Sequence, residues 1–295
     1  METIRCAVIG GAGYIGEHLA YYLKRRGCAC TVYDIRDGGH FSYSKLDVCD
    51  RQSFASLDLS VDYIFLFTGL SGTYVGFDNY ARFNAVNELG LLNLLDAIRR
   101  SDYRPKIIFP SSRLVYKGKD VPLKETDEKE SKTVYAVNKL ACEGLLHAYH
   151  CSFDIPYTVF RICIPYGNVL SADYSFGTIG FFIKQASSGK DITLFGGGTL
   201  KRTFTHMEDL CFQIVEGALK EASTGEIYNV GGETLTLCQA AEVVASKFGT
   251  NVTSVPWPEK DKRIESDHTY FDDAKIQALL GGFSYRRLAD FSKDI

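Results

Sequence analysis

Two side chains suited to acid–base chemistry, Tyr135 and Lys139, stand four residues apart. On a helix this spacing places both side chains on one face. Two serines, Ser111 and Ser112, follow an apolar run at Lys106–Pro110 that has the pattern of a buried strand. Because ligands of an open parallel sheet bind beyond the carboxyl ends of its strands, we expect these four side chains to meet at one site.

Tyr135, Lys139 and Ser112 indicate proton transfer to and from a substrate hydroxyl. A tyrosine in water has a pKa near ~10, too high for a base at neutral pH. The ammonium of Lys139 and a positively charged cofactor ring would both favour the phenolate. Lowering the pKa by ~3 units needs only about 4 kcal/mol of differential stabilisation. Tyr135 would then accept the proton while Ser112 holds the same oxygen. The alternative is an exposed helical pair beside a turn serine.

A glycine-rich turn near the start of the chain is typical of a dinucleotide-binding site. The apolar run Ile4–Ile9 leads into residues 10–16, with the sequence GGAGYIG, and a helix is expected to follow. Gly11, Gly13 and Gly16 fit the fingerprint of a tight turn, a close approach to a pyrophosphate and close helix packing. The N-terminus of the helix then offers free N–H groups and a positive dipole end to the diphosphate.

Asp34 and Arg36 come directly after the next apolar run, Thr31–Tyr33. A carboxylate at this position accepts hydrogen bonds from a ribose diol and repels a 2′-phosphate, which favours NAD over NADP. Arg36 keeps NADP open as an alternative. Asp47 follows a further apolar segment, where it either reaches the adenine edge or lies in a solvated loop.

Short apolar runs alternate with amphipathic stretches in the first half of the chain, which predicts βαβ units. We expect an α/β fold, a Rossmann-type doubly wound parallel sheet with a smaller C-terminal α/β lobe. Ala85–Ile98 is apolar on more than one face, so a sheet and a partner subunit would cover it. The expected strands are Ile4–Ile9, Thr31–Tyr33, Tyr63–Phe67, Lys106–Pro110, Tyr157–Arg161 and Ile227–Val230, and the expected later helices are Ile179–Ser188, Glu208–Glu221 and Leu235–Phe248.

Composition and charge exclude several classes of protein. The 295 residues include 33 basic and 36 acidic side chains, whereas a general nucleic-acid binder shows a basic excess. The charge-free stretch Tyr63–Phe77 is too short and too rich in glycine to span a bilayer. Nine cysteines without a Cys-x-x-Cys pair give no support to a metal site. We expect reduced thiols in a cytoplasmic protein, with neither nucleic acid nor membrane as partner.

Together these residues resemble the extended short-chain dehydrogenase/reductase family, in particular its nucleotide-sugar epimerases, dehydratases and reductases. The likeness covers nearly the whole chain. The motifs that fall in the family's order are Gly10–Gly16, Asp34, Asp47, Phe67-Thr68-Gly69-Leu70, Asn87, Ser111-Ser112 with Val115-Tyr116, Tyr135 and Lys139, Arg161 with Tyr166-Gly167, Phe195-Gly196 with Arg202, His206–Asp209, Tyr228–Gly232 and Arg263.

The resemblance implies NAD as the cofactor and a nucleoside-diphosphate sugar as the substrate. In the family, arginines matching Arg202 and Arg263 clamp the diphosphate. The implied cofactor-binding positions are Gly10, Gly13, Tyr14, Ile15, Gly16, Asp34, Ile35, Arg36, Asp47, Val48, Phe67, Thr68, Gly69, Asn87, Ser111, Tyr135, Lys139 and Ile164. The implied substrate-binding positions are Ser71, Ser112, Arg113, Tyr135, Arg202 and Arg263.

Three departures from the family's patterns narrow the reaction. The dehydratases carry an Asp-Glu pair directly after the active-site serine or threonine, whereas Arg113 and Leu114 follow Ser112. Elimination of water from the sugar would therefore lack its acids. Galactose-type epimerases often have an asparagine where Ile164 stands, and some have a lysine where Ser71 stands. UDP-galactose is therefore not the substrate we expect.

The reaction that fits best is NAD-dependent epimerisation of a nucleoside-diphosphate sugar at C4, through a transient keto-sugar with Tyr135 as base. The alternatives are an NAD(P)H-dependent 4-keto-sugar-nucleotide reductase and a non-enzymatic dinucleotide-sensing protein, which would have no need of a base. Residues 1–161 with 205–232 are expected to form the NAD-binding domain, and residues 162–204 with 233–295 the substrate lobe. The resemblance also implies a homodimer formed through Ala85–Ile98 and Tyr135–His150.

Overall fold

The short apolar runs of the sequence form a seven-stranded sheet in the computed structural model, which describes residues 3–36, 41–171 and 176–291. The strand order is β10-β6-β5-β4-β1-β2-β3, and every neighbouring pair runs parallel. All residues of β5 and β6 are buried, because helices cover both faces of the sheet. The strands are β1 (Arg5–Ile9), β2 (Ala29–Asp34), β3 (Tyr43–Lys45), β4 (Tyr63–Leu66), β5 (Lys106–Ser112), β6 (Tyr157–Ile162) and β10 (Glu226–Asn229).

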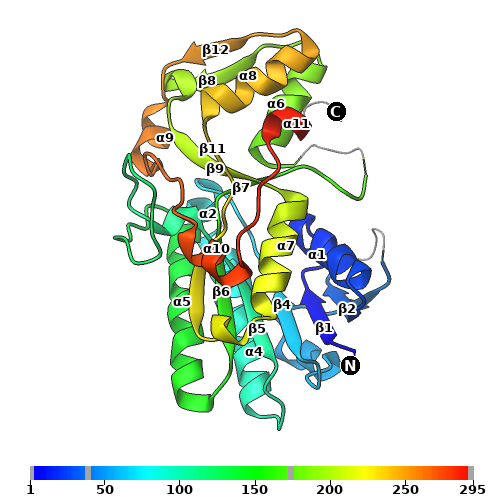
Figure 1. Cartoon of the computed structure of the whole chain (residues 1–295). Helices are drawn as coiled ribbons and strands as arrows, with labels where there is room; N and C mark the ends of the chain where they lie inside the picture. The colour runs from blue at the N-terminus through cyan, green and yellow to red at the C-terminus, as the bar shows by residue number, and fades with distance from the viewer. Residues whose placement is uncertain (1–2, 37–40, 172–175, 292–295) are drawn as a thin grey trace.

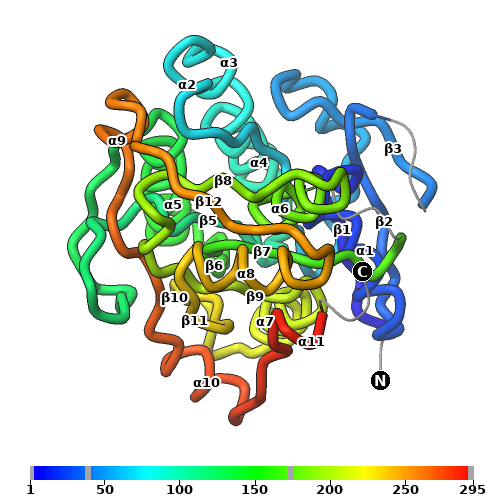
Figure 2. The backbone as a smooth tube through the Cα atoms, turned by 90° about the horizontal axis from the view of Figure 1, so that it is seen from above, coloured from blue at the N-terminus to red at the C-terminus, as the bar shows by residue number. Residues whose placement is uncertain are grey.

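Two apolar cores lie on opposite faces of this sheet. On one face α1 (Tyr14–Arg25), α7 (Met207–Ala218) and α10 (Ala274–Leu280) pack against the strands. On the other face the cover is formed by η1 (Arg51–Ser56), α4 (Gly90–Arg99) and α5 (Val134–Phe153). Figure 2, which looks down on the molecule, separates α4 and α5 from α1 and α7 across the sheet. The expected Rossmann-type doubly wound sheet is therefore confirmed.

A smaller lobe lies beyond one end of the sheet (Figure 1) and has a core of its own. A three-stranded sheet in the order β11-β9-β7 and a parallel pair formed by β12 and β8 support it. Its strands are β7 (Ile164–Tyr166), β8 (Ile192–Phe195), β9 (Lys201–His206), β11 (Glu233–Thr236) and β12 (Val252–Val255), and its helices are α6 (Gly177–Ser187), η4 (Gly196–Gly198), α8 (Leu237–Phe248), α9 (Glu259–Ile264) and α11 (Leu288–Phe291).

Three expected helices differ from the structure for local reasons, two of which are described first. The apolar stretch Ala85–Ile98 is not one regular helix, since α3 (Tyr80–Asn84) and a π-helical turn, η2 (Ala85–Leu89), precede α4. The expected helix Leu235–Phe248 begins two residues late. Thr236 ends β11 and caps α8, where its hydroxyl accepts a hydrogen bond from the Gln239 N–H at 3.0 Å. The Gln239 side chain accepts in return from the Thr236 N–H at 2.9 Å, which completes a capping box.

The remaining elements are α2 (Val75–Asp78), η3 (Arg113–Val115) and η5 (Glu221–Ser223). The last of these corrects the expected helix Glu208–Glu221, because α7 ends at Ala218 and the chain turns before η5. Within the described ranges, no helix is both long and apolar enough to cross a membrane.

Candidate active site

The glycine-rich turn between β1 and α1 is built by close main-chain contacts. Gly10 has a φ of +85°, and a Cβ there would lie 2.4 Å from the Thr68 nitrogen. A Cβ on Gly16 would lie 2.2 Å from the Gly10 carbonyl oxygen. Gly13 caps α1 without any side-chain hydrogen bond to the first turn. The N-terminus of α1 is therefore left open for an anion such as a diphosphate, and the turn fits a dinucleotide.

Asp34 ends β2 beside this turn and is itself buried. One of its carboxylate oxygens accepts a hydrogen bond from the Ala12 N–H at 2.9 Å, and the other accepts from the Arg36 N–H at 3.1 Å. A carboxylate has about four lone-pair sites, so it retains acceptors for two ribose hydroxyls. The Arg36 guanidinium donates to the Ala12 carbonyl at 2.8 Å and lies at the same place. Asp34 and Arg36, the two residues expected to influence the preference for NAD over NADP, are therefore in contact.

Tyr14, the first residue of α1, connects the glycine-rich turn to the smaller lobe. Its hydroxyl donates to the Gly167 carbonyl at 2.5 Å, and its ring stacks on Phe176 with centroids 4.5 Å apart. One turn further along α1, His18 Nε2 lies 3.0 Å from the side-chain oxygen of Asn168. The cofactor turn and the segment that follows β7 are therefore held together.

The other expected cofactor positions lie along the carboxyl edge of the sheet. The Asn87 side chain, in the π-helical turn, accepts from the Leu70 N–H at 2.8 Å and donates to the Leu70 carbonyl at 3.0 Å, which fixes the loop after β4. Ile35 and Asp47 are exposed, and Asp47 accepts from the Cys49 N–H at 2.9 Å. Val48, Phe67, Thr68 and Ile164 are buried or half-buried, whereas Gly69 and Ser71 are exposed in the loop after β4.

Ser112 and Tyr135 meet at the carboxyl end of β5. Thr133 caps α5 by accepting a hydrogen bond from the Ala136 N–H at 3.1 Å, which sets Tyr135 in the first turn of the helix. Ser112 is the last residue of β5 and pairs with Ile162 of β6. The Ser112 hydroxyl lies beside the Tyr135 phenol, close enough to act on its pKa. The serine and the tyrosine predicted from the sequence are therefore brought together.

Lys139 lies one turn after Tyr135 on the same face of α5 and is only 5% exposed. Its ammonium lies 4.4 Å from the ring centroid of Phe109 and 5.8 Å from that of Tyr135. A Cβ on Gly69 would approach the ammonium to 3.9 Å. Among the described residues, Lys139 makes no hydrogen bond or ion pair through this ammonium. Burial lowers the pKa of Lys139 to about 8, with the nearby Cys142 and Glu143 acting in the opposite direction.

The phenol of Tyr135 differs from the expectation of a lowered pKa. Burial raises the pKa of Tyr135 to about 12, with the nearby Ser112 hydroxyl acting in the opposite direction. The chain alone therefore keeps the phenol protonated at neutral pH. Low polarity around the oxygen, which no spacing rule reveals, outweighs the hydroxyl of Ser112.

Behind these side chains lies a buried ion pair that the sequence reasoning missed. Glu143, one turn beyond Lys139, accepts hydrogen bonds from Arg161 at 2.9 and 2.6 Å and from the Ser111 hydroxyl at 2.5 Å. Arg161 also donates to the Tyr116 hydroxyl at 2.7 Å. The pair thus joins β5, β6 and α5 directly beneath Ser112. The only indication in the sequence was that Glu143 follows Lys139 by four residues, which places both side chains on one face of the helix.

The expected substrate arginines fall into two places. Arg202, in β9, is 1% exposed and forms an ion pair of 2.7 Å with Glu265. Arg113 lies 3.8 Å from the same carboxylate oxygen. Burial, followed by the charge of Arg113, lowers the pKa of Arg202 to about 10. Arg263 is exposed on α9 and does not join this cluster. Glu265 was not anticipated, because its partner in β9 lies 63 residues away.

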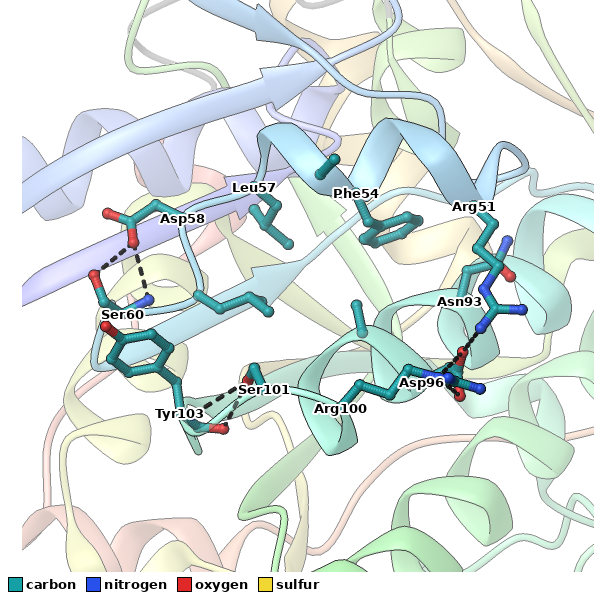
Figure 3. A pocket seen from close by; sticks show the side chains of 13 residues that line it. Arg51, Phe54, Leu57, Asp58, Ser60, Asn93, Asp96, Arg100, Ser101 and Tyr103 are labelled. Atoms are coloured by element: carbon teal, nitrogen blue, oxygen red, sulfur yellow. Dashed lines mark hydrogen bonds and ion pairs between the residues drawn. The ribbon is translucent and has the colours of Figure 1, made fainter.

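A surface groove of about 520 Å³ lies away from all of these residues (Figure 3). It runs between η1 and the end of α4, where Arg51 and Arg100 both pair with Asp96. Ser60 and Tyr103, which also line it, precede β4 and β5. The groove is therefore at the amino ends of the strands, and ligands of this fold bind at the carboxyl ends. In the parts of the chain that the structure describes, no group of His, Cys, Asp and Glu side chains is placed to hold a metal ion.

The glycine-rich turn, Asp34 and the Tyr135–Lys139 pair at the carboxyl edge of the sheet define a dinucleotide-dependent enzyme of the Rossmann type. Residues 6–231 match the NAD dependent epimerase/dehydratase family, so the chain belongs to this family and NAD is its cofactor. The resemblance to extended short-chain dehydrogenases/reductases is thereby confirmed.

Known relatives and solved structures agree with this assignment. A UDP-N-acetyl-alpha-D-glucosaminuronate decarboxylase of Bacillus cytotoxicus is 29% identical over 245 residues, which cover 78% of this chain and 75% of the relative. A protein of Bacillus subtilis named as an uncharacterized UDP-glucose epimerase is 27% identical over 296 residues, covering 94% and 92%. The fold is similar to that of UDP-glucuronic acid 4-epimerase from Bacillus cereus in complex with UDP-glucuronic acid and NAD, with a TM-score of 0.82, 22% identity and coverage of 98% and 97%.

Proposed function

We propose that this protein is an NAD-dependent nucleoside-diphosphate-sugar epimerase acting at C4. The observation that carries the proposal is the placement of Ser112 and Tyr135 beside the buried Lys139, whose ammonium makes no hydrogen bond or ion pair with the described residues. A buried charge of this kind is costly unless a ligand or a reaction uses it. The family membership and the named activities of the relatives support the same reaction.

Each side chain of the trio has a distinct task in this proposal. NAD bound at the glycine-rich turn would supply the ring that accepts the hydride from C4 and later returns the hydride to the same carbon. Tyr135 takes the proton of the 4-hydroxyl and later gives it back on the other face of the keto-sugar. Ser112 donates a hydrogen bond to the same sugar oxygen. The pKa of Tyr135 is high in the chain alone, so the phenolate needs a positive charge nearby. The ammonium of Lys139 brings that charge.

The proposed site extends over both parts of the fold. The NAD site takes the cofactor positions named from the resemblance, in residues 1–161 with 205–232. The sugar nucleotide lies between this domain, which contributes Ser71 and Arg113, and residues 162–204 with 233–295, which contribute Arg202 and Arg263. Within the second range, α10 packs against the large sheet and is not part of the smaller lobe. The burial of Arg202 against Glu265 supports a role as a fixed cation. The exposure of Arg263 on α9 leaves its guanidinium accessible to a diphosphate.

We also propose a homodimer through the helices on one face of the sheet. Leu89 in η2 is 46% exposed and Val137 in α5 is 50% exposed, on elements that pack against each other. Apolar side chains so placed favour burial against a second copy. Sedimentation of the wild-type protein beside Leu89→Glu tests this, and a monomeric wild type would contradict it. All nine cysteines are free, which supports a cytoplasmic protein.

The experiment that tests the reaction uses a panel of UDP-, GDP-, dTDP- and CDP-sugars. We expect purified protein to carry NAD and to form the C4 epimer of one sugar nucleotide without added reductant, as read by NMR. Tyr135→Phe should lower turnover about 10³-fold, the scale of a lost general base, and leave the NAD content unchanged. The matched control, Tyr103→Phe, changes an exposed tyrosine in the groove of Figure 3 and should keep full activity.

Two results would contradict the proposal. Stoichiometric consumption of NADH or NADPH with a 4-keto-sugar nucleotide, and no epimerisation, would make the protein a reductase with the same residues. Equal rates for Tyr135→Phe and the wild type would remove Tyr135 from the mechanism.

A further inference from the structure

One side chain of α5, Asn138, is almost fully buried although the proposed reaction gives it no task. It is 1% exposed and lies between Tyr135 and Lys139 in the chain. A buried amide needs partners for its nitrogen and for its oxygen. Asn138 finds these partners in α3 and in the π-helical turn η2, which pack against α5. Its contacts therefore bear on how this turn is held.

Three polar side chains converge on the Asn138 amide. Its nitrogen donates to the Asn84 side-chain oxygen at 2.9 Å and to a carboxylate oxygen of Glu88. Its oxygen accepts a hydrogen bond from the Asn87 amide at 3.4 Å. One turn further along the same face of α5, the Cys142 thiol donates to the main-chain carbonyl of Asn87 at 3.1 Å. Helix α5 therefore contacts both the side chain and the main chain of Asn87.

The turn that these contacts hold departs from regular helix geometry. The Gly90 N–H bonds to the Ala85 carbonyl, five residues back instead of four, which makes η2 π-helical. Turns of this kind are rare and are found frequently at functional sites. The extra residue offsets the faces of the flanking helices α3 and α4 by about 100° relative to a regular helix. The orientation of Asn87 therefore depends on the contacts that keep the turn in this form.

Asn87 connects the turn to the loop after β4. Its side chain accepts from the Leu70 N–H at 2.8 Å and donates to the Leu70 carbonyl at 3.0 Å. Gly69, the preceding residue of that loop, lies beside Lys139, since a Cβ there would be 3.9 Å from the ammonium. In the proposed reaction the ring of NAD that exchanges the hydride lies at Lys139, whereas Asp34 is at the other end of the cofactor. The loop is therefore at the nicotinamide end.

We propose that Asn138 is a positioning residue for the nicotinamide end of NAD, and that it acts through η2, Asn87 and the loop after β4. This inference rests on the proposed function, because the reaction decides which end of NAD lies at α5. In this role Asn138 keeps Asn87 in the orientation in which both hydrogen bonds to Leu70 form. Asn84 is exposed and Glu88 is half-buried, so water can replace the amide at both, and the fold does not depend on Asn138.

The test compares two probes, NAD and ADP-ribose, of which the second lacks the nicotinamide ring. Both are titrated by calorimetry into the full chain after removal of bound NAD. Asn138→Leu keeps the approximate size of the side chain and removes its hydrogen bonds. We expect it to weaken NAD about tenfold, the scale of one or two lost hydrogen bonds, and ADP-ribose less than about twofold. Asn138→Ser keeps one hydroxyl and should weaken NAD about fourfold, again with ADP-ribose unchanged.

The matched control is Asn251→Leu, which changes an exposed asparagine of the smaller lobe that bonds to Asp191, and it should bind both probes as the wild type does. Equal weakening of NAD and ADP-ribose would show a general disturbance of the NAD domain and would overturn the inference, as would unchanged binding of NAD. If Asn138→Leu does not fold, Asn138→Ser decides by the same comparison. The titrations contain no sugar nucleotide, so these outcomes refute the inference alone, whereas a panel of sugars without epimerisation refutes the proposed function.

Discussion

Replacing Lys139 by methionine should stabilise the fold while removing activity. The ammonium is 5% exposed, and burial lowers its pKa from 10.5 to about 8. A shift of this size corresponds to about 3 kcal/mol at ~1.4 kcal/mol per pKa unit. Unfolding entropies of ~2.1 cal/mol/K per residue give about 0.6 kcal/mol/K for 295 residues. Lys139→Met should therefore raise the melting temperature of the NAD-free protein by about 5 °C.

The sign of the pH dependence makes this prediction specific. The folded-state pKa of Lys139 is below the unfolded one, so the penalty is complete below about pH 8. It then declines as the pH rises to about 10.5, because the native lysine loses its proton first. The difference between variant and wild type should accordingly be large at pH 7 and small at pH 10.

Calorimetry of both proteins at the two pH values, after removal of NAD, measures the effect. Lys190→Met, which changes an exposed lysine after α6, should shift the melting temperature by less than about 1 °C and serves as the control. An unchanged or lower melting temperature for Lys139→Met at pH 7 would refute the reasoning, and so would a difference that stays constant up to pH 10.

Three further predictions concern the cofactor turn and the buried ion pair. Asp34→Ala should weaken NAD binding about tenfold and NADP binding less. NAD loses its ribose contacts, whereas for NADP the loss of the carboxylate also relieves its repulsion of the 2′-phosphate. Titration calorimetry with both cofactors checks this, and equal weakening would contradict the role of Asp34. Gly16→Ala should lose NAD, since its Cβ would lie 2.2 Å from the Gly10 carbonyl oxygen; retained NAD in the purified variant would argue against the close packing. Glu143→Gln leaves Arg161 unpaired and should cost about 3–5 kcal/mol in urea unfolding. The double variant Glu143→Leu with Arg161→Met should cost less than the single one, and a larger loss would show that the pair is itself strongly stabilising.

The large sheet and the meeting of Ser112 with Tyr135 could be predicted because both depend on local patterns. The buried strands are continuous apolar runs, and the ends of parallel strands share an edge. The strands β7 and β8 of the smaller lobe carry no such pattern, and their partners β9 and β12 lie far along the chain. Helix boundaries were set by caps that periodicity does not show, as Thr236 illustrates.

The side chains that the sequence did not reveal are those whose partners come from distant segments. Glu143 reaches Arg161 and Ser111 across two strands, and Glu265 reaches Arg202 in another sheet. The raised pKa of Tyr135 has the same origin, because it depends on how completely the folded chain excludes water from one oxygen.

The contact of Tyr14 with Gly167 and Phe176 has a thermodynamic consequence for the two ligands of this enzyme. The helix at the NAD-binding turn and the lobe that we propose to receive the sugar nucleotide are in contact at that point, so we expect a movement of one to disturb the other. If one ligand binds more tightly to one arrangement of this contact and so changes the affinity for the second ligand, the second ligand changes the affinity for the first by the same factor. In such a molecule, a substitution at this contact would change the affinity for NAD and the affinity for the sugar nucleotide together.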